Sequence, residues 1–273
     1  MSQSFRLALK SIASSKMRSF LTMLGIIIGV ASVILLVSLM QGMTGEVTDM
    51  FESMGTNLLT VSVQGRGSSR SVDVDDMYAL AEEHPDIFLA MSPTVSVQGT
   101  VKVGTETYSP SVTGVSEAYN TIGKLEIGEG RFLSYTDMED RHKVAVVGTY
   151  LAKDVFGGDA IGQTVKINGT QYTIIGVLTE QDDSFEGSAD DCIYLPYTTA
   201  SKLTFGAISS FTFATINTDY NDQASDLIDR ALYEVFQNED FYNITDMASL
   251  LDQVNEMTGM MTMVLVGIAS ISL

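Results

Sequence analysis

An uncharged stretch of twenty residues, LTMLGIIIGVASVILLVSLM at 21–40, constrains this chain more than any other feature. At ~1.5 Å per residue, a helix of that length covers ~30 Å, which is the thickness of the hydrocarbon core of a bilayer. The alternative is a cleaved signal peptide, whose apolar region is roughly 7–15 residues long and ends at a small-x-small cleavage site. The sequence SLMQGMTGE that closes this stretch is a poor cleavage site. We therefore expect a retained transmembrane helix.

The residues before the stretch predict its orientation. Arg6, Lys10, Lys16 and Arg18 precede it, and no acidic residue does. Because cytoplasmic flanks are rich in Lys and Arg, these four residues should lie on the cytoplasmic face. Residues 1–19 also have an apolar face, which predicts a short amphipathic helix that lies on the inner membrane surface or docks a cytoplasmic partner.

The rest of the chain is strongly acidic. The full sequence has 15 basic and 34 acidic residues, so 11 basic residues remain against all 34 acidic ones once the N-terminal four are set aside. This part should lie outside the cytoplasm. Its charge argues against nucleic acid as a partner.

A second apolar stretch, MTGMMTMVLVGIASISL at 257–273, stands at the other end of the chain. Its 17 uncharged residues cover only ~25 Å as a helix, so they predict a second span that is cut short. We expect the chain to be part of a longer multi-pass membrane protein. The expected order is a cytoplasmic helix at 1–19, a first span and stalk at 20–54, an external domain at 55–245, and a stalk and second span at 246–273.

Both spans are expected to continue into the domain as helical stalks. Apolar residues recur in steps close to three and four after the first span and before the second, as on one face of a helix. The stalk residues are Met43, Val47, Met50 and Met54 in the first, and Met247, Leu250, Leu251 and Val254 in the second, with Asp246 as a helix N-cap. Because such stripes are costly to leave in water, the stalks should pack against each other or against a second copy.

The region between the spans predicts a mixed α+β domain. Alternating patterns indicate strands at 58–63, 94–103, 144–148 and 209–217, and a hairpin at 165–178 that turns at Asn168-Gly169. Helices are expected at 73–83, 149–156 and 222–236.

No motif for catalysis, cofactor binding or metal binding is found. The stretch GGDAIGQT resembles a phosphate loop, but Gln163 stands where the lysine is required and the preceding residues favour a helix rather than a strand. The acidic loop at 182–191 lacks the glutamate that a calcium loop needs at its twelfth position. A single cysteine, Cys192, cannot form an internal disulfide. We expect no enzyme activity in this chain.

The first span contains Gly25 and Gly29, a G-x-x-x-G pair. Small residues four apart let a second helix approach closely, so these glycines are candidates for helix packing.

Several separated blocks resemble one family. RSFLTMLGIIIGVASVI at 18–34 is similar to the first transmembrane segment of MacB/FtsX-type ABC transporter permeases. The long block from GRFLSYTDMEDRHKVAVVG to VKINGTQYTIIGVL at 130–178 resembles the core of that family's periplasmic domain. IYLPYTTA at 193–200 and LVGIASISL at 265–273 fit the same pattern.

The resemblance implies a permease in the inner membrane with a large extracytoplasmic domain between its first two helices. In such proteins that domain has a porter-like α/β part and a β-rich insertion. ATP is then bound by a separate cytoplasmic ABC ATPase, near which Arg6, Lys10, Lys16 and Arg18 would lie. The other expected partners are a second copy or a sister permease, an extracytoplasmic adaptor and membrane lipid.

Two functions follow from the resemblance. In the first, the chain belongs to an exporter that couples ATP hydrolysis to movement of its external domain, known as mechanotransmission. In the second, an FtsX-like regulatory role, the domain recruits or activates an envelope enzyme. The sequence separates these two functions poorly, and the transported substrate does not follow from it.

Overall fold

The computed structural model describes residues 16–63, 72–181, 184–204, 208 and 210–272. The chain forms two compact units. The helical unit falls within residues 1–53 and 250–273, and the domain comprises residues 54–249.

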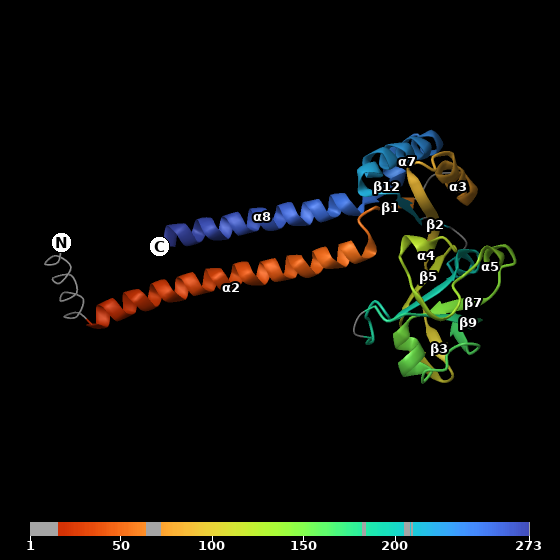
Figure 1. Cartoon of the computed structure of the whole chain (residues 1–273), viewed down its shortest axis with the longest axis horizontal. Helices are drawn as coiled ribbons and strands as arrows, with labels where there is room; N and C mark the ends of the chain where they lie inside the picture. Colours follow the sequence, from red (N-terminus) through yellow and green to blue (C-terminus); the bar gives the residue numbers. More distant parts are fainter. Residues whose placement is uncertain (1–15, 64–71, 182–183, 205–207, 209, 273) are drawn as a thin grey trace. The chain divides into compact units, whose positions relative to one another are not determined.

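Two long helices make up the helical unit. Helix α2 (Lys16–Met54) has 39 residues and helix α8 (Met247–Ser272) has 26. Both are continuous in Figure 1, and α2 runs through Gly42 and Gly45 without a break. The predicted continuation of the first apolar helix as far as Met54 is therefore confirmed.

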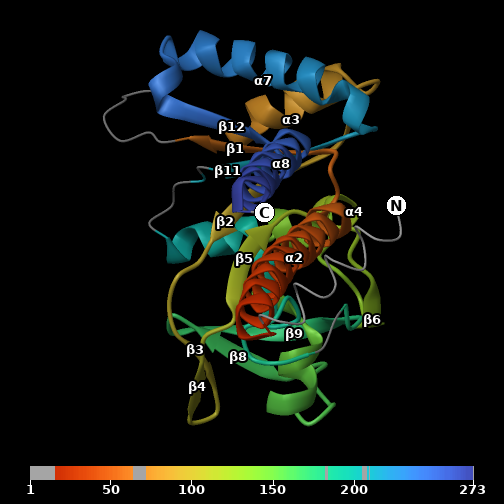
Figure 2. The same ribbon diagram turned by 90° about the vertical axis from the view of Figure 1, so that its left-hand side faces the viewer.

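The domain has two lobes, of which the first is an antiparallel sheet covered by two helices. Its strands lie in the order β12-β1-β11-β2. In Figure 2, α3 and α7 cover one face of this sheet. The elements are, in chain order, β1 (Leu58–Val63), α3 (Val74–Glu83), β2 (Phe88–Ser96), β11 (Ser210–Thr215), α7 (Asn221–Phe236) and β12 (Tyr242–Asp246). This is the β-α-β-β-α-β arrangement of ferredoxin-like folds, with a long insertion between β2 and β11.

The two helices of this lobe are held by one apolar core. Met77 of α3 and three apolar residues of α7 pack on the inner sides of β1 and β11. The α7 residues are Ala224, Ile228 and Leu232, each fully buried, as the apolar stripe in the sequence predicts. Asp73 precedes α3 and forms a capping box with Asp76, which explains why α3 begins where the sequence predicts.

The insertion forms the second lobe, which is rich in β-structure. Its strands continue the sheet in the order β5-β10-β7-β9-β8-β3-β4, and β6 pairs with β9. The strands are β3 (Val101–Val103), β4 (Glu106–Tyr108), β5 (Ser111–Val115), β6 (Ile127–Gly130), β7 (Val144–Val147), β8 (Thr164–Ile167), β9 (Thr170–Leu178) and β10 (Cys192–Pro196). The helical segments are α4 (Tyr119–Ile122), α5 (Tyr135–Glu139), η1 (Leu151–Val155), α6 (Tyr197–Ala200) and η2 (Ser201–Leu203).

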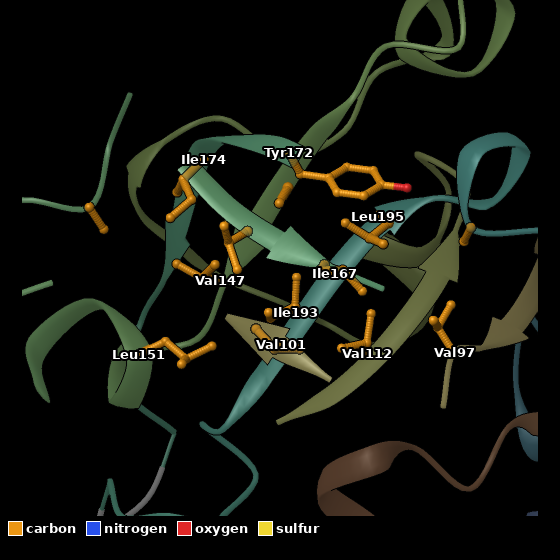
Figure 3. Close-up of a cluster of buried hydrophobic side chains, with 14 of the residues drawn as sticks. Val97, Val101, Val112, Val147, Leu151, Ile167, Tyr172, Ile174, Ile193 and Leu195 are labelled. Carbon is orange, nitrogen blue, oxygen red and sulfur yellow. The ribbon is translucent and has the colours of Figure 1, made fainter. Parts of the chain in front are cut away.

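Branched aliphatic side chains fill the core of the second lobe. Figure 3 shows Val147, Ile174, Ile193 and Leu195, from three different strands, packed around a common centre. Ile193 and Leu195 are fully buried on the central strand β10, which pairs with β5 in parallel and with β7 antiparallel. The predicted α+β fold, a porter-like part with a β-rich insertion, is the fold observed.

The predicted hairpin forms as β8 and β9, and its turn uses Asn168 and Gly169 at φ +46° and +86°. Both positive angles are those that a type I′ turn requires. The predicted strand at 94–103 is wrong in one respect, because it is divided into β2 and β3 around Gly99, where φ is +150°. The predicted helix at 149–156 is a π-helix, η1, whose Leu151 carbonyl accepts a hydrogen bond from the Phe156 amide.

Candidate functional site

Helix α2 carries a segment that could cross a membrane. Among the described residues, one helical segment, Phe20–Asp49, is long and apolar enough to do so, and its most apolar part is not buried by any other part of the chain. Large side chains such as Ile27 and Leu35 are exposed by 60% and 70%. This apolar surface needs a nonaqueous environment or a partner helix. The second predicted span, at 257–273, does not meet the same criterion within the described residues and stays a prediction.

The two helices of this unit meet at a pair of threonines. The Thr44 and Thr258 hydroxyl oxygens lie 3.0 Å apart, and they also lie 2.9 Å from the carbonyl oxygens of Met40 and Val254, one turn earlier. Two hydroxyl protons serve these three contacts, so one threonine donates to the other while its partner donates to its own helix. Such a bond between helices is an expected contact in an apolar environment, where polar groups need partners.

Half-buried residues on α2 mark the side that faces inward. They recur every three or four residues, as in a helix that packs along a seam. These residues, which we name the seam, are Val30, Val33, Val37, Met40, Thr44 and Thr48. The predicted stalk residues Met43 and Val47 lie one position away and are 62% and 37% exposed. The side chains of Met50 and Met54 lie outside the described residues.

The predicted residues of the second stalk are all half-buried. Leu250, Leu251 and Val254 lie on α8. Met247, the first residue of α8, belongs to the domain, where it packs against a small apolar cluster that includes Leu58 and Ile122. Thus α8 begins inside the packing of the domain itself.

The remaining predicted residues of the helical unit are exposed or not described. Arg6 and Lys10 lie outside the described residues, and only the backbone of Lys16 is described, whereas Arg18 is exposed. A Cβ atom added at Gly25 or Gly29 would meet nothing within 4 Å. The glycine pair therefore faces open space in the single chain, and its role in packing stays a prediction.

Inside the domain, the residues that follow α2 and precede α8 lie on neighbouring strands. β1 and β12 are antiparallel, and Leu59 pairs with Asp246. Only Gly55, Thr56 and Asn57 separate α2 from β1, and no residue separates β12 from α8. At most three residues therefore connect each helix to its strand. We name residues 55–59 and 245–248 the helix roots.

Asp246 caps α8, as predicted. Its carboxylate accepts hydrogen bonds from the backbone N–H groups of Ala248 and Ser249, at 3.1 and 3.2 Å, and from the Ser249 hydroxyl at 2.7 Å. These bonds satisfy N–H groups that a helix start otherwise leaves without a partner.

A buried amide joins both roots, and sequence reasoning did not find it. Asn221, the first residue of α7, is 3% exposed. Its Nδ2 lies 3.0 Å from the Thr56 carbonyl oxygen and 2.6 Å from Asp246 Oδ1. Its Oδ1 lies 2.7 Å from the Thr215 hydroxyl. An asparagine at the start of a helix reads as an ordinary cap, and no local signal reveals partners 165 and 25 residues away.

The second lobe holds a buried carboxylate, Asp137, bonded to a guanidinium. Arg131 donates to both of its oxygens, at 2.6 and 3.1 Å, and Ser134 and His142 add further contacts. Burial acts to raise the pKa of Asp137, but the bonds from Arg131, Ser134 and His142 outweigh it and hold that pKa well below its usual value. This cluster stabilises the start of α5, because Ser134 and Asp137 form its capping box.

The loop that resembles a phosphate loop has the wrong surroundings. It follows the π-helix η1 and leads into strand β8, whereas a phosphate loop joins a strand to a helix. Gly157 and Gly162 adopt positive φ angles, as turns between such elements require.

The acidic loop at 182–191 ends in buried carboxylates. Asp191 is 5% exposed, and its Oδ2 accepts a hydrogen bond from the Gly187 backbone N–H at 2.9 Å. Burial raises the pKa of Asp191 from its ordinary value, and the charge of Glu186 adds to this, although the Gly187 bond opposes it. Within the described parts of the chain, no group of three or more His, Cys, Asp or Glu residues could hold a metal ion.

Comparisons with known proteins agree with this architecture. A macrolide export ATP-binding/permease protein MacB of Azoarcus sp. (strain BH72) is 32% identical over 277 residues, which cover 98% of this chain and 42% of that protein. A protein of the same name from Chlorobium luteolum is 29% identical over 277 residues, covering 96% of this chain and 42% of that protein. The chain thus spans less than half the length of these relatives.

Solved structures share the fold. The periplasmic region of MacB from Actinobacillus actinomycetemcomitans superposes with a TM-score of 0.59 at 20% identity, covering 75% of this chain and 95% of that chain. The extracellular domain of the noncanonic ABC-type transporter YknZ from Gram-positive bacteria gives a TM-score of 0.56 at 17% identity, covering 69% of this chain and all of that chain.

The family model of the MacB-like periplasmic core domain matches residues 19–231, which is most of the chain. A periplasmic core domain that follows an apolar N-terminal helix is the arrangement of an inner-membrane protein with an extracytoplasmic domain. This chain belongs to the family of MacB-like ABC transporter permeases and carries its periplasmic core domain.

Proposed function

We propose that this chain is the permease part of an ABC exporter, in which α2 and α8 carry movement from a cytoplasmic ATPase to the extracytoplasmic domain. One observation supports this most strongly. α2 is an unbroken helix of 39 residues that ends three residues before the first strand of the domain. α8 begins directly at the Asp246 cap, without any linker. A continuous helix transmits a displacement, whereas a flexible linker absorbs it.

The energy source in this proposal is ATP bound by a partner. The relatives are named ATP-binding/permease proteins, and this chain covers 42% of their length. The phosphate-loop-like stretch has Gln163 in place of lysine and lies between a helix and a strand. The chain itself is therefore expected to lack ATP binding and enzyme activity. That the ATPase is a separate subunit near Lys16 and Arg18 rests on the family resemblance.

A second copy of the permease, or a sister permease, is the expected membrane partner. The Gly25–Gly29 pair faces open space, and the apolar Met43 side chain points away from the seam with α8. A second transmembrane helix would cover these residues, and glycines four apart would let it approach closely. The roles of an extracytoplasmic adaptor and of membrane lipid rest on the family resemblance.

A macrolide is the first substrate to test, because the curated relatives carry macrolide export in their names. The FtsX-like regulatory role rests on resemblance alone, since no observation favours it over export.

Reconstitution tests the proposal. The full-length permease and its partner ATPase are placed in inverted membrane vesicles, and accumulation of a labelled macrolide is measured with and without ATP. Accumulation should need ATP and both subunits, and vesicles with an ATPase that cannot hydrolyse ATP are the control. ATP-dependent accumulation by the present chain without the ATPase, or ATP hydrolysis by the chain alone, would contradict the proposal.

A further inference from the structure

The amide of Asn221 is fixed in one orientation by its partners. Its Nδ2 contacts two groups that only accept hydrogen bonds, the Thr56 carbonyl and the Asp246 carboxylate. If the amide turned over, its Oδ1 would face both acceptors, at 2.6 and 3.0 Å, without a proton between them. Because the side chain is 3% exposed, water could not compensate. The observed orientation is therefore strongly preferred.

The backbone ladder of the sheet does not reach all of the first root. Pairing between β1 and β12 ends at Leu59 and Asp246, so Gly55, Thr56 and Asn57 lie beyond it. Gly55 has φ +97°, which is a conformation that favours glycine and suits a hinge between α2 and β1. Without side-chain bonds, movement of α2 could be lost by bending at this point.

Several hydrogen bonds hold this short segment, including those of the Thr215 hydroxyl to the Asn57 carbonyl and between the Thr218 and Thr56 hydroxyls. Asn57 donates to the Thr215 carbonyl at 2.5 Å, and the Thr215 backbone N–H donates to the Asn57 carbonyl at 2.9 Å, so Asn57 is tied to β11. Asn221 is different, because the same Nδ2 atom contacts the first root at Thr56 and the second root at Asp246. Figure 2 shows α7, the helix that Asn221 begins, lying over β12 and β1.

We propose that Asn221 is a positioning residue that locks the two helix roots to each other and to α7, so that the domain follows both helices as one body. This inference rests on the proposed function and adds to it the residue where the transmitted movement enters the domain. The bond to Asp246 matters most, because hydrogen bonds to a charged group are stronger than those between neutral groups. The Asp246 carboxylate also caps α8. One residue therefore both caps the second helix and binds the side chain that contacts the first root.

The first measurement reports on the tie itself and does not depend on transport. Hydrogen–deuterium exchange is followed in the full-length permease for the peptides that contain residues 54–58 and 246–250. In Asn221→Ala both peptides should exchange at least about tenfold faster, because one side chain contacts both roots. The control is Asn243→Ala, an exposed asparagine of β12 whose side chain, among the residues that the structure describes, donates to Thr245 alone. Equal exchange in the two variants would overturn the proposal.

The second measurement reports on coupling. In vesicles with the partner ATPase, Asn221→Ala should keep ATP hydrolysis but lose most of the export per ATP, by about tenfold, whereas Asn243→Ala should match the wild type. If the wild type shows no ATP-dependent export at all, the proposed function fails, and the exchange result still decides whether the tie exists. If Asn221→Ala exports as much per ATP as the wild type, its role in coupling is wrong, and the exchange experiment alone then decides whether the tie exists.

Exchanging the two side chains separates a specific bond from general stability. Asn221→Asp places two carboxylates together and should slow export, while Asp246→Asn keeps a residue that can cap α8. The double variant Asn221→Asp/Asp246→Asn again places a donor opposite an acceptor, with the donor now on residue 246, although the carboxylate at position 221 cannot donate to the Thr56 carbonyl. Export per ATP should recover at least partly relative to Asn221→Asp, and no recovery in a folded double variant would contradict the proposed bond.

Discussion

The hydroxyl oxygens of Thr44 and Thr258 lie 3.0 Å apart, although 214 residues separate them in the chain. This contact fixes which sides of α2 and α8 face each other. It places Thr44 on the seam and leaves the neighbouring Met43 exposed. The two helices therefore have a defined register, as the proposed joint movement of the pair requires.

Cysteines at these two positions should form a disulfide. In a Cys192→Ala background, Thr44→Cys/Thr258→Cys should cross-link within one chain under mild oxidation, because the hydroxyl oxygens that the two sulfur atoms replace lie 3.0 Å apart. The product is detected by its mobility on a non-reducing gel before and after reduction. The matched pair Met43→Cys/Thr258→Cys should stay largely uncrosslinked, and equal cross-linking of both pairs would show that the register is wrong.

A cysteine in the domain should be accessible only from outside the cell. Thr105 is exposed in the turn between β3 and β4, so Thr105→Cys should react with a membrane-impermeant thiol reagent in intact cells. Ser4→Cys, which precedes the first span, should react only after the membrane is opened, because the basic residues around it favour the cytoplasm. Labelling in the reverse pattern would invert the topology.

The native thiol should be inert while the domain is folded. Cys192 is 7% exposed on β10, and burial raises the pKa of its thiol to about 12, with further contributions from the charges of Asp190 and Asp191. Modification by iodoacetamide should therefore stay slow from pH 7 to pH 9 in the folded chain and become rapid in denaturant. Fast modification of the folded chain at pH 8 would show that the strand is not packed as described.

The Arg131–Asp137 pair should make the domain sensitive to acid. Because the pKa of Asp137 is lowered in the folded state, the pair stabilises that state above the ordinary pKa of a carboxyl group, and this stabilisation is lost as the pH falls below that value. Asp137→Asn should lower the unfolding free energy at pH 7 by about 2–3 kcal/mol. Between pH 5 and pH 2 the variant should then lose less unfolding free energy than the wild type, because it has no carboxylate at this position to protonate. Unfolding is followed by near-ultraviolet circular dichroism of the tyrosines.

Asp140→Asn is the control for that experiment. The Asp140 side chain is 68% exposed, and its Oδ2 lies 3.9 Å from Nε2 of His142. This variant should unfold like the wild type at every pH. If Asp137→Asn behaves in the same way as Asp140→Asn, the buried pair contributes nothing to acid sensitivity.

Local signals in the sequence predicted much of this fold. Asn168 and Gly169 specify their turn because few other residues accept two positive φ angles in succession, and Asp246 reads as a cap because its side chain can reach the next backbone N–H groups. The apolar stripe of α7 similarly predicts which face packs on the sheet. The division of one expected strand at Gly99 was missed, because alternation alone does not show where one strand ends and the chain enters another part of the sheet.

The candidate site was predicted less well, for a physical reason. A search for an apolar stripe selects Met43 and Val47, whereas two half-buried positions of the seam carry threonines, Thr44 and Thr48, whose hydroxyls read as polar in a sequence. The role of Asn221 depends on partners brought together by the sheet order, and no pattern within α7 encodes that order.

The central claim is that an intact α2 transmits movement, and a proline in that helix tests it most directly. Val47→Pro removes one backbone hydrogen bond of the helix and clashes with the preceding turn, at a cost of ~3 kcal/mol or more to the helix, whereas Val47→Ala keeps the helix.

Both variants are made in the full-length permease with its ATPase in liposomes, with a spin label at Thr105→Cys in each copy of a Cys192→Ala background. The measurement is the change in distance between the two labels on ATP addition, together with the rate of ATP hydrolysis. The account predicts that Val47→Ala keeps the ATP-driven distance change, and that Val47→Pro hydrolyses ATP but loses it. A folded, correctly inserted Val47→Pro permease that still shows the full wild-type distance change would contradict it, because α2 would then be only a tether.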